Sequence, residues 1–203
     1  MPDTMSDVAV RRTDSLGGQV TPRIAGSDLV LEQAPHLARF ILRGDEAGKL
    51  AGEVVGAALP QRPGSASGAA GRHALWLGPD EWLLLAAEAD GPAFDEALQK
   101  TLVNVAHALV DVSHRQTAIL IAGDNAARAL NAAVPLDLHP SQFPVGKAVR
   151  TIFEKAEIVL WRTGTDSFHI EVWRSFAPYV AEFLSLVRSE HAAEGAAHTS
   201  GPR

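Results

Sequence analysis

Apolar residues along this chain follow two alternating periods, one typical of strands and one typical of helices. Short runs rich in Leu, Ile, Val and Trp predict β-strands, whereas apolar residues at every third or fourth position predict amphipathic helices. The predicted strands are residues 38–44, 73–78, 81–87, 107–113, 117–123 and the two halves of 157–173. The predicted helices are residues 45–59, 90–105, 125–134 and 174–187, and residues 60–72 are expected to be a flexible loop.

The order of these elements occurs twice. Each half runs strand, helix, hairpin and helix, and each hairpin turn reads Gly-x-Asp-x-aromatic: Gly78, Asp80 and Trp82, then Gly164, Asp166 and Phe168. Gly44-Asp45 and Gly123-Asp124 precede matching helices, so we expect Asp45 and Asp124 at equivalent helix starts. The sequence therefore predicts an α+β fold of duplicated split-βαβ (ferredoxin-like) units, with two antiparallel sheets and two helices on each.

The chain outside the duplicated region is polar and aperiodic. We expect residues 1–28 to form an extended N-terminal arm, 29–114 the first α+β lobe, 115–191 the second, and 192–203 a disordered tail. Irregularly spaced apolar residues occur at Val8, Val10, Leu16, Val20, Ile24, Leu29, Val30 and Leu31. We predict that part of this segment becomes buried only against a larger partner chain; the alternative is a dispensable leader.

Composition argues against several classes of function. The formal net charge of −6, without a local Lys/Arg cluster, disfavours nucleic acid as a partner. The chain has no cysteine, which excludes disulfides, thiolate nucleophiles and sulfur-ligated metals. The first residues lack the apolar core of a signal peptide, and no apolar run approaches the ~20 residues that span a bilayer. We therefore expect a cytoplasmic chain that does not bind membranes.

The stretch 110–117, VDVSHRQT, brings together an acid, a hydroxyl, an imidazole and a guanidinium, in Asp111, Ser113, His114 and Arg115. One interpretation is a catalytic serine. On a strand, however, Ser113 and its neighbour His114 point to opposite faces, and no Gly-x-Ser-x-Gly turn presents the hydroxyl. The alternative is a hydrogen-bonded ladder of Asp111, Ser113 and Arg115 where one sheet passes to the next. This geometry favours the ladder, so we predict no catalytic residue.

The other residues that could carry chemistry are scattered. The histidines form no i, i+4 helical pair and no His-x-His strand pair, so we predict no metal site. The glycines of residues 64–71 lack the strand-to-helix context of a dinucleotide site. All four tryptophans fall in hairpin strands, where core packing is the usual role, but Trp76 and Leu77 cannot both point inward. We therefore predict structural or interface roles for Trp76, Trp82 and Trp173.

Four motifs in order give a more specific indication. LRG (42–44), WLGPDEWLLL (76–85), VDVSHRQTAI (110–119) and FHIEVWRSFAPYV (168–180) together resemble the gamma subunit family of heterotetrameric sarcosine oxidases. The segment from VDVSHRQT to the strand near residue 151 is also similar to the aminomethyltransferase (glycine-cleavage T-protein) superfamily. The resemblance covers residues 37–188 and implies a fold like the folate-binding domain of an aminomethyltransferase.

The resemblance also implies an activity and partners. Complexes of this family oxidatively demethylate sarcosine to glycine, transfer the one-carbon unit to tetrahydrofolate as 5,10-methylenetetrahydrofolate, and produce peroxide from oxygen. The partners would be large alpha and beta subunits and a small delta subunit. FAD, FMN, NAD and tetrahydrofolate would be held by the other subunits, with none bound here. This chain would then be an accessory subunit for assembly and stability.

A second interpretation keeps the folate for this chain. In it the protein is a stand-alone aminomethyltransferase-like folate-binding protein, with Asp111, Arg150 or Glu157 as the polar contacts. The segment around Glu157 departs from the transferase pattern, because it lacks a Gly-rich connection that bears an aspartate. This departure favours the accessory subunit, and a titration of the purified chain with a reduced folate distinguishes the two interpretations.

Overall fold

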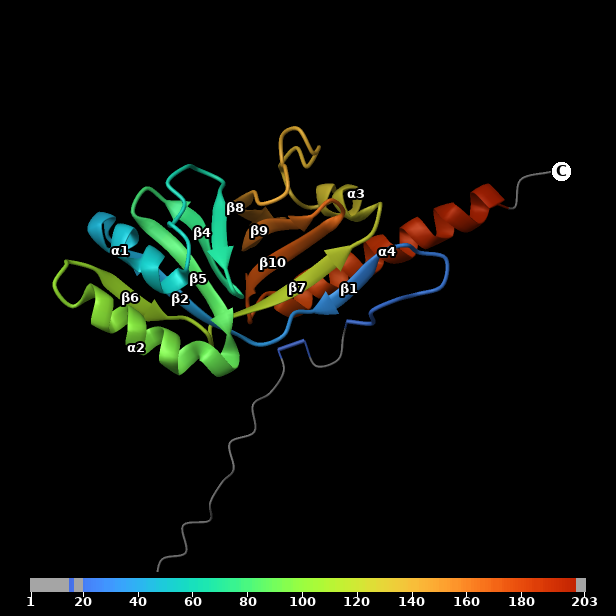
Figure 1. Ribbon diagram of the computed structural model, residues 1–203. Helices are drawn as coiled ribbons and strands as arrows, with labels where there is room; N and C mark the ends of the chain where they lie inside the picture. The colour runs from blue at the N-terminus through green and yellow to red at the C-terminus, as the bar shows by residue number, and fades with distance from the viewer. Residues whose placement is uncertain (1–14, 17–19, 200–203) are drawn as a thin grey trace, which may run out of the picture.

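The computed structural model describes residues 15–16 and 20–199, and it shows two lobes, each built on a five-stranded sheet (Figure 1). Every strand pair in both sheets is antiparallel. The predicted α+β class with two antiparallel sheets and helices is confirmed. No helix within the described ranges is long and apolar enough to cross a bilayer.

The sheet of the first lobe is buried on both faces, because alternate residues along its strands point to opposite sides and both sides carry apolar residues. Its strands, in spatial order, are β3 (Ala66–Ala69), β4 (Arg72–Gly78), β5 (Glu81–Ala87), β2 (Leu37–Arg43) and β6 (Ala108–Asp111). Its helices are α1 (Asp45–Val55), the short 3-10 helix η1 (Glu88–Asp90) and α2 (Gly91–Leu102). Phe40 and Leu42 of β2 join the core beneath α1 and α2. Ile41, on the other face of β2, packs against a cluster that includes residues of both lobes.

The second lobe repeats this arrangement. Its strands, in spatial order, are β8 (Ala148–Phe153), β9 (Ala156–Gly164), β10 (Ser167–Trp173), β7 (Gln116–Ala122) and β1 (Val30–Gln33). Its helices are α3 (Ala126–Asn131) and α4 (Ala177–Thr199). Ile170 and Val172 of β10 pack with Leu184 of α4 in the core of this lobe. The alternate residues of β10, His169 and Glu171, point the other way and make the contacts described below.

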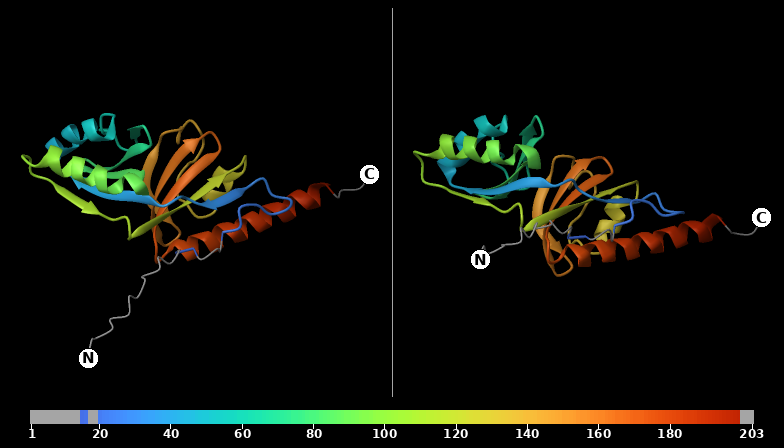
Figure 2. Two further views of the ribbon diagram at one scale, coloured as in Figure 1. Left: turned by 60° about the horizontal axis from the view of Figure 1, so that its bottom comes forward. Right: turned by 90° about the horizontal axis from the view of Figure 1, so that it is seen from below.

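The two sheets face each other, with the helices of each lobe on the far side (Figure 2). A third apolar cluster fills the space between the sheets, where Leu75 and Leu85 of the first lobe pack with Val159 of the second. The sheets also meet edge to edge, because Ser65 and Lys147 form an isolated antiparallel bridge. The lobes therefore share a core and a backbone contact.

The hairpin aromatics confirm the predicted duplication. Trp82 is the second residue of β5 and lies opposite Leu42, while Phe168 is the second residue of β10 and lies opposite Ile121. Both rings are 1% exposed and belong to the core of their own lobe. Trp82 and Phe168 thus occupy equivalent strand positions.

The strand β2 and its second-lobe counterpart β7 are each followed by a glycine, Gly44 and Gly123. Gly44 and Gly123 have φ values of 128° and 125°, which side-chain-bearing residues rarely adopt. Each donates its N–H to the carbonyl of the hairpin-turn aspartate in its own lobe, Asp80 at 2.9 Å and Asp166 at 3.0 Å. A Cβ on either glycine would lie 2.8 or 2.5 Å from a backbone oxygen. The repeated glycine is therefore a steric requirement of both copies.

The helices that follow these glycines start differently. Asp45 is the first residue of α1, and Gly44 occupies the N-cap position without a side-chain cap hydrogen bond. The helix α3 begins only at Ala126, two residues after Asp124. The carboxylate of Asp28 accepts hydrogen bonds from the backbone and side-chain nitrogens of Asn125, at 3.0 and 3.2 Å. A contact from the N-terminal segment therefore sets this helix start, which a comparison of the two halves cannot reveal.

The edge strand β1 comes from the range assigned to the first lobe. Val30–Gln33 pair with β7 and so belong to the second sheet, not to a 29–114 unit. In the first sheet the corresponding edge position is held by β6, which follows α2. The second sheet thus takes its edge strand from the N-terminal side, whereas the edge strand of the first sheet follows the second helix of that lobe.

The N-terminal segment is partly buried within this chain. Leu16, Leu29 and Leu31 are each 1% exposed and lie in the core of the second lobe. The guanidinium of Arg188 on α4 donates to the carbonyl oxygens of residues 21 and 22. The prediction that these leucines become buried only against a partner chain is therefore wrong. Residues 1–14 and 17–19, with the two N-terminal valines, lie outside the described residues.

Two segments expected to be irregular have regular structure. Residues 192–199 continue α4 instead of forming a disordered tail, because their alanines have the highest helix propensity of any residue. Residues 200–203 lie outside the described part. The loop predicted over 60–72 contains β3, whose backbone pairs with β4. Neither segment has an apolar period that would reveal its structure, and β3 is defined by its pairing with β4.

Candidate functional site

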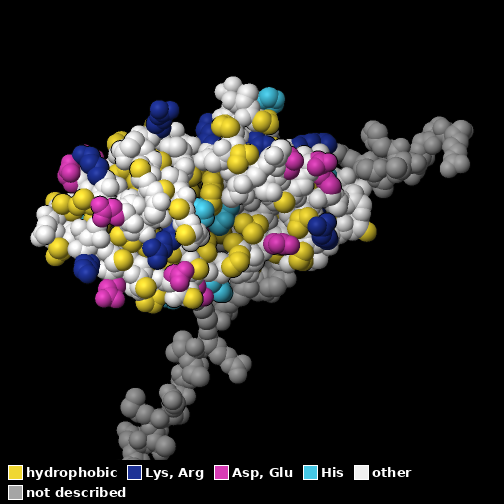
Figure 3. Space-filling model, viewed as in Figure 1, with side chains coloured by type: hydrophobic (Ala, Val, Ile, Leu, Met, Phe, Trp, Pro, Cys, Tyr) yellow, Lys and Arg dark blue, Asp and Glu magenta, His cyan; other side chains and the backbone are white. Residues whose placement is uncertain are grey.

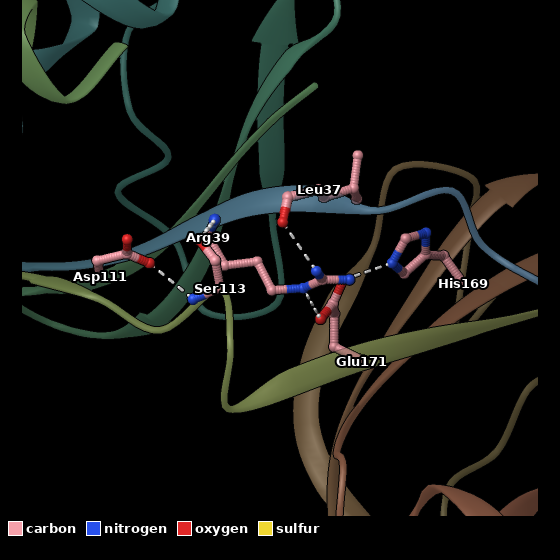
Figure 4. A network of polar contacts seen from close by, with 6 residues as sticks. All are labelled: Leu37, Arg39, Asp111, Ser113, His169 and Glu171. Atoms are coloured by element: carbon pink, nitrogen blue, oxygen red, sulfur yellow. Dashed lines mark hydrogen bonds and ion pairs between the residues drawn. The ribbon is translucent and has the colours of Figure 1, made fainter. Parts of the chain in front are cut away.

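A buried ion pair joins the facing surfaces of the two lobes (Figure 4). Arg39 of β2 donates from Nε to Oε2 of Glu171 at 2.7 Å and from Nη2 to Oε1 at 3.1 Å. Its Nη1 donates to the carbonyl of Leu37 at 3.0 Å. Arg39 is 2% exposed and Glu171 is fully buried. This two-pronged contact satisfies both carboxylate oxygens and fixes the relative orientation of β2 and β10.

The duplication gives a second, equivalent pair of positions between the two lobes, and these positions do not hold an ion pair. Counting from the equivalent positions Trp82 and Phe168, Glu171 corresponds to Leu85 in the first lobe. By the same register Arg39 corresponds to Ala118 in the second. Burying two charges carries a desolvation cost that apolar residues avoid. The pair therefore serves to orient the lobes, and it depends on both partners being present.

His169 supports the carboxylate from the same strand. Its Nε2 donates to Oε1 of Glu171 at 2.7 Å. Burial opposes ionisation of Glu171, but the hydrogen bond from His169 and the charge of Arg39 outweigh it and hold the pKa of this carboxyl below its usual range. Trp161 lies between His169 and His73, with ring centroids 5.8 and 4.9 Å away. Burial, then the charge of His169, lowers the pKa of His73.

Histidine and hydrophobic side chains also gather on the surface at the boundary between the lobes, on the face drawn in Figure 3. His73 is half-buried, whereas His169 is only 6% exposed. No group of three or more His, Asp or Glu side chains in the described ranges is arranged to hold a metal ion. His169 contacts Glu171, whereas the buried indole nitrogen of Trp161 between the two histidines has no hydrogen-bond partner among the described residues.

The VDVSHRQT stretch contacts the backbone of Arg39, one of the two residues of the ion pair. The strand β6 ends at Asp111 and residues 112–115 form a turn, so the predicted strand over 107–113 is too long. Ser113 Oγ accepts the backbone N–H of Arg39 at 2.9 Å, and Ser113 N donates to Oδ1 of Asp111 at 2.8 Å. Arg115 does not extend this ladder, because its guanidinium lies 5.3 Å from the ring centre of Trp173.

A pocket of about 190 Å³ opens beside this turn. Asp111, Ser113 and His114 line it from the turn, and Glu88 and Asp95 line it from η1 and α2. His114 is exposed, and its ring faces the pocket residues instead of the buried ion pair. Three carboxylates in the lining suit a cationic group better than an anionic one.

The three candidate folate contacts lie on three different strands. Asp111 ends β6 in the first sheet, whereas Arg150 and Glu157 belong to β8 and β9 in the second. Arg150 Nη2 donates to Oε1 of Glu81 at 2.6 Å, which forms a second ion pair between the lobes. Glu157 is exposed near the turn from β8 to β9. Arg150 is therefore already paired with a protein carboxylate, and a folate site at these residues stays untested.

The tryptophans divide into core and surface. Trp82 donates from Nε1 to the carbonyl of Pro60 at 2.7 Å, and its ring occupies the space that a side chain at Gly48 would need. Its role is structural. Trp173 is 39% exposed at the end of β10, and Trp76 is half-buried on β4. An interface role for these two residues stays a prediction.

One known protein family matches the sequence over most of its length. The family described as "Sarcosine oxidase, gamma subunit family" matches residues 47–190. This chain belongs to that family. Sarcosine oxidase subunit gamma of Corynebacterium sp. (strain U-96) is 36% identical over 139 residues, 68% of this chain and 67% of that protein. The subunit gamma of Arthrobacter sp is 34% identical over 139 residues, 68% of each chain.

Solved structures place this gamma-family chain beside two groups of proteins. It superposes on a chain of the heterotetrameric sarcosine oxidase from Corynebacterium sp. U-96, in complex with pyrrole 2-carboxylate, with a TM-score of 0.82. That match has 29% identity and covers 89% of this chain and 96% of the other. The glycine cleavage system aminomethyltransferase T from Bartonella henselae gives a TM-score of 0.61 at 16% identity, covering 84% and 48%. The expected aminomethyltransferase-like fold is confirmed.

Sequence reasoning missed the residues at the centre of the site. Arg39 interrupts the apolar strand ARFIL, and a charge in the middle of a buried strand signals a buried partner. His169 and Glu171 are two residues apart, so they share a face of one strand. Both signals are visible in this gamma-family sequence, but neither says that the two strands face each other.

The stability of this gamma-family chain should fall in two steps as the pH is lowered. Below pH 6.5, the ordinary value for His73, the unfolded chain binds a proton that the folded chain disfavours, so stability falls until the lower folded pKa is passed. The contribution of Glu171 is complete above its ordinary value of 4.5 and is lost as the pH falls through its lower folded pKa. Urea unfolding at a series of pH values measures both steps.

Variants assign each step to its group. His73→Gln should reduce the loss of stability that begins below pH 6.5, and Glu171→Gln should reduce the loss that begins below pH 4.5. A variant whose stability changes with pH as steeply as the parent's would show that the step belongs to another residue.

Proposed function

We propose that this chain is the accessory gamma subunit of a cytoplasmic heterotetrameric sarcosine oxidase, where its role is assembly and stability of the complex. The single observation that carries the proposal is the superposition on a chain of the solved heterotetramer, which covers 96% of that chain. The same comparison covers only 48% of the aminomethyltransferase. The proposed partners are the alpha, beta and delta subunits.

The proposed complex oxidatively demethylates sarcosine to glycine. Tetrahydrofolate accepts the one-carbon unit as 5,10-methylenetetrahydrofolate, and oxygen is reduced to peroxide. We place FAD, FMN, NAD and tetrahydrofolate in the other subunits. The contacts within this chain support that assignment, because Ser113, Glu171 and Arg150 already bond to protein groups. The stand-alone folate-binding alternative lacks an observation in its favour.

Co-expression with the other subunits tests the proposal. A tagged copy of this chain should recover a flavin-containing complex that makes peroxide from sarcosine, while the chain expressed alone should be colourless and make none. Omitting the chain should lower the yield or stability of the complex. A chain that recovers no other subunit, and that binds a reduced folate in a titration, would overturn the proposal in favour of the folate-binding alternative.

A further inference from the structure

Apolar side chains line the outer surface where β10 passes into α4. Trp173, Phe176, Tyr179 and Leu186, called here the α4 ridge, are 39, 41, 38 and 59% exposed. They are four of the eight exposed large hydrophobic residues in the described part of the chain, and they fall within 14 consecutive positions. Single exposed apolar residues are ordinary, whereas a contiguous group that includes three aromatic rings is typical of an interaction surface.

The backbone explains why these residues share one side. Phe176 N donates to the carbonyl of Trp173, and Val180 N donates to that of Phe176, so the helical winding begins before α4 itself. Val180 and Leu184 face inward and belong to the core of the second lobe. The helix therefore has two apolar surfaces, and the lobe covers only the inner one.

A groove runs along the ridge. Tyr179, Phe183 and Leu186 line a volume of about 490 Å³, together with Glu182 and two serines. The ring of Phe183 also contacts the core, because it packs edge to face against Phe153 with a distance of 5.3 Å between ring centroids. An apolar groove with a polar border matches the composition of protein–protein interfaces.

The charges next to the ridge indicate the chemistry of the occupant. Arg115 is exposed over the ring of Trp173, and no acidic side chain within the described ranges forms an ion pair with it. Arginine and tryptophan dominate the energetically important positions of interfaces. His114, which precedes Arg115 in the same turn, lines an acidic pocket together with Asp95 and Asp111. A complementary surface has a carboxylate opposite Arg115 and a cationic group opposite the pocket.

We propose that the α4 ridge, Arg115 and the adjoining acidic pocket form one docking surface for another subunit of the oxidase. The partner presents apolar side chains to the ridge, a carboxylate to Arg115 and a lysine or arginine to the pocket. This inference rests on the proposed function. The occupant is assigned to a different chain, because the similar solved structure is a heterotetramer and so contains other kinds of subunit.

Recovery of partner subunits from the co-expressed complex tests the surface. The double variant Phe176→Ser/Tyr179→Ser should recover about ten-fold less of the other subunits than the parent chain, and Arg115→Glu should also reduce recovery. The matched controls are Val103→Ser and Val145→Ser, which replace residues 71 and 57% exposed outside the ridge. Both controls should recover the partners as the parent does.

A measurement without mutation guards against variants that fail to fold. Oxidative footprinting of the intact parent complex should label Trp173 and Tyr179 weakly, although they are 39 and 38% exposed in this chain. Strong labelling of both rings in the complex, or full partner recovery by the ridge variants, would overturn the docking surface. Recovery of an untagged copy of this chain, lost in the ridge variant, would assign the ridge to self-association instead. Failure of the parent chain to recover any subunit would overturn the proposed function itself.

Discussion

Replacing Glu171 by leucine should lower the free energy of unfolding by about 3–5 kcal/mol, because Arg39 would remain buried without its carboxylate. Arg39 is 2% exposed and donates two hydrogen bonds to Glu171, so no water can take over that contact without opening the space between the sheets. His169 would lose its acceptor as well. Urea unfolding at neutral pH measures the loss.

Two controls separate burial of the charge from loss of the contact. The double variant Arg39→Leu/Glu171→Leu should regain most of the stability, since apolar residues already occupy the equivalent positions of the other copy. Arg150→Gln breaks the more exposed pair between the lobes, with side chains 36 and 19% exposed, and should cost less than about 1 kcal/mol. A Glu171→Leu variant no less stable than Arg150→Gln would refute the importance of the buried pair.

Replacing Trp82 by alanine should lower the free energy of unfolding by about 3–5 kcal/mol, because a large cavity would replace the indole. The ring is 1% exposed and packs directly over Gly48 of α1, where a Cβ would lie 2.3 Å from it. The carbonyl of Pro60 would also lose its hydrogen bond from the indole nitrogen. Urea unfolding again provides the measurement.

The matched control is the same substitution at a surface tryptophan. Trp173→Ala should cost about 1 kcal/mol or less in this chain, because 39% of that residue is already exposed. Similar losses for Trp82→Ala and Trp173→Ala would mean that Trp82 is not central to the first core.

The duplicated fold could be predicted because its signals are local and repeated. The Gly-x-Asp-x-aromatic turns, and the glycines that end β2 and β7, mark the same backbone geometry in both lobes. Steric limits on φ act within a few residues, so a printed sequence shows them directly. The equivalent strand positions of Trp82 and Phe168 followed from the same comparison. The ordered motifs also indicated the family to which the chain belongs.

The sequence by itself determined the two antiparallel units and the absence of thiol chemistry, since period and composition are properties of the chain. Tertiary structure alone decided which distant strands meet. Arg39 and Glu171 are 132 positions apart, and Val30–Gln33 pair with β7 in a lobe that the linear order does not suggest. Such pairings depend on how two sheets pack after each has formed, because alternation along a strand specifies a face but not the surface opposite it.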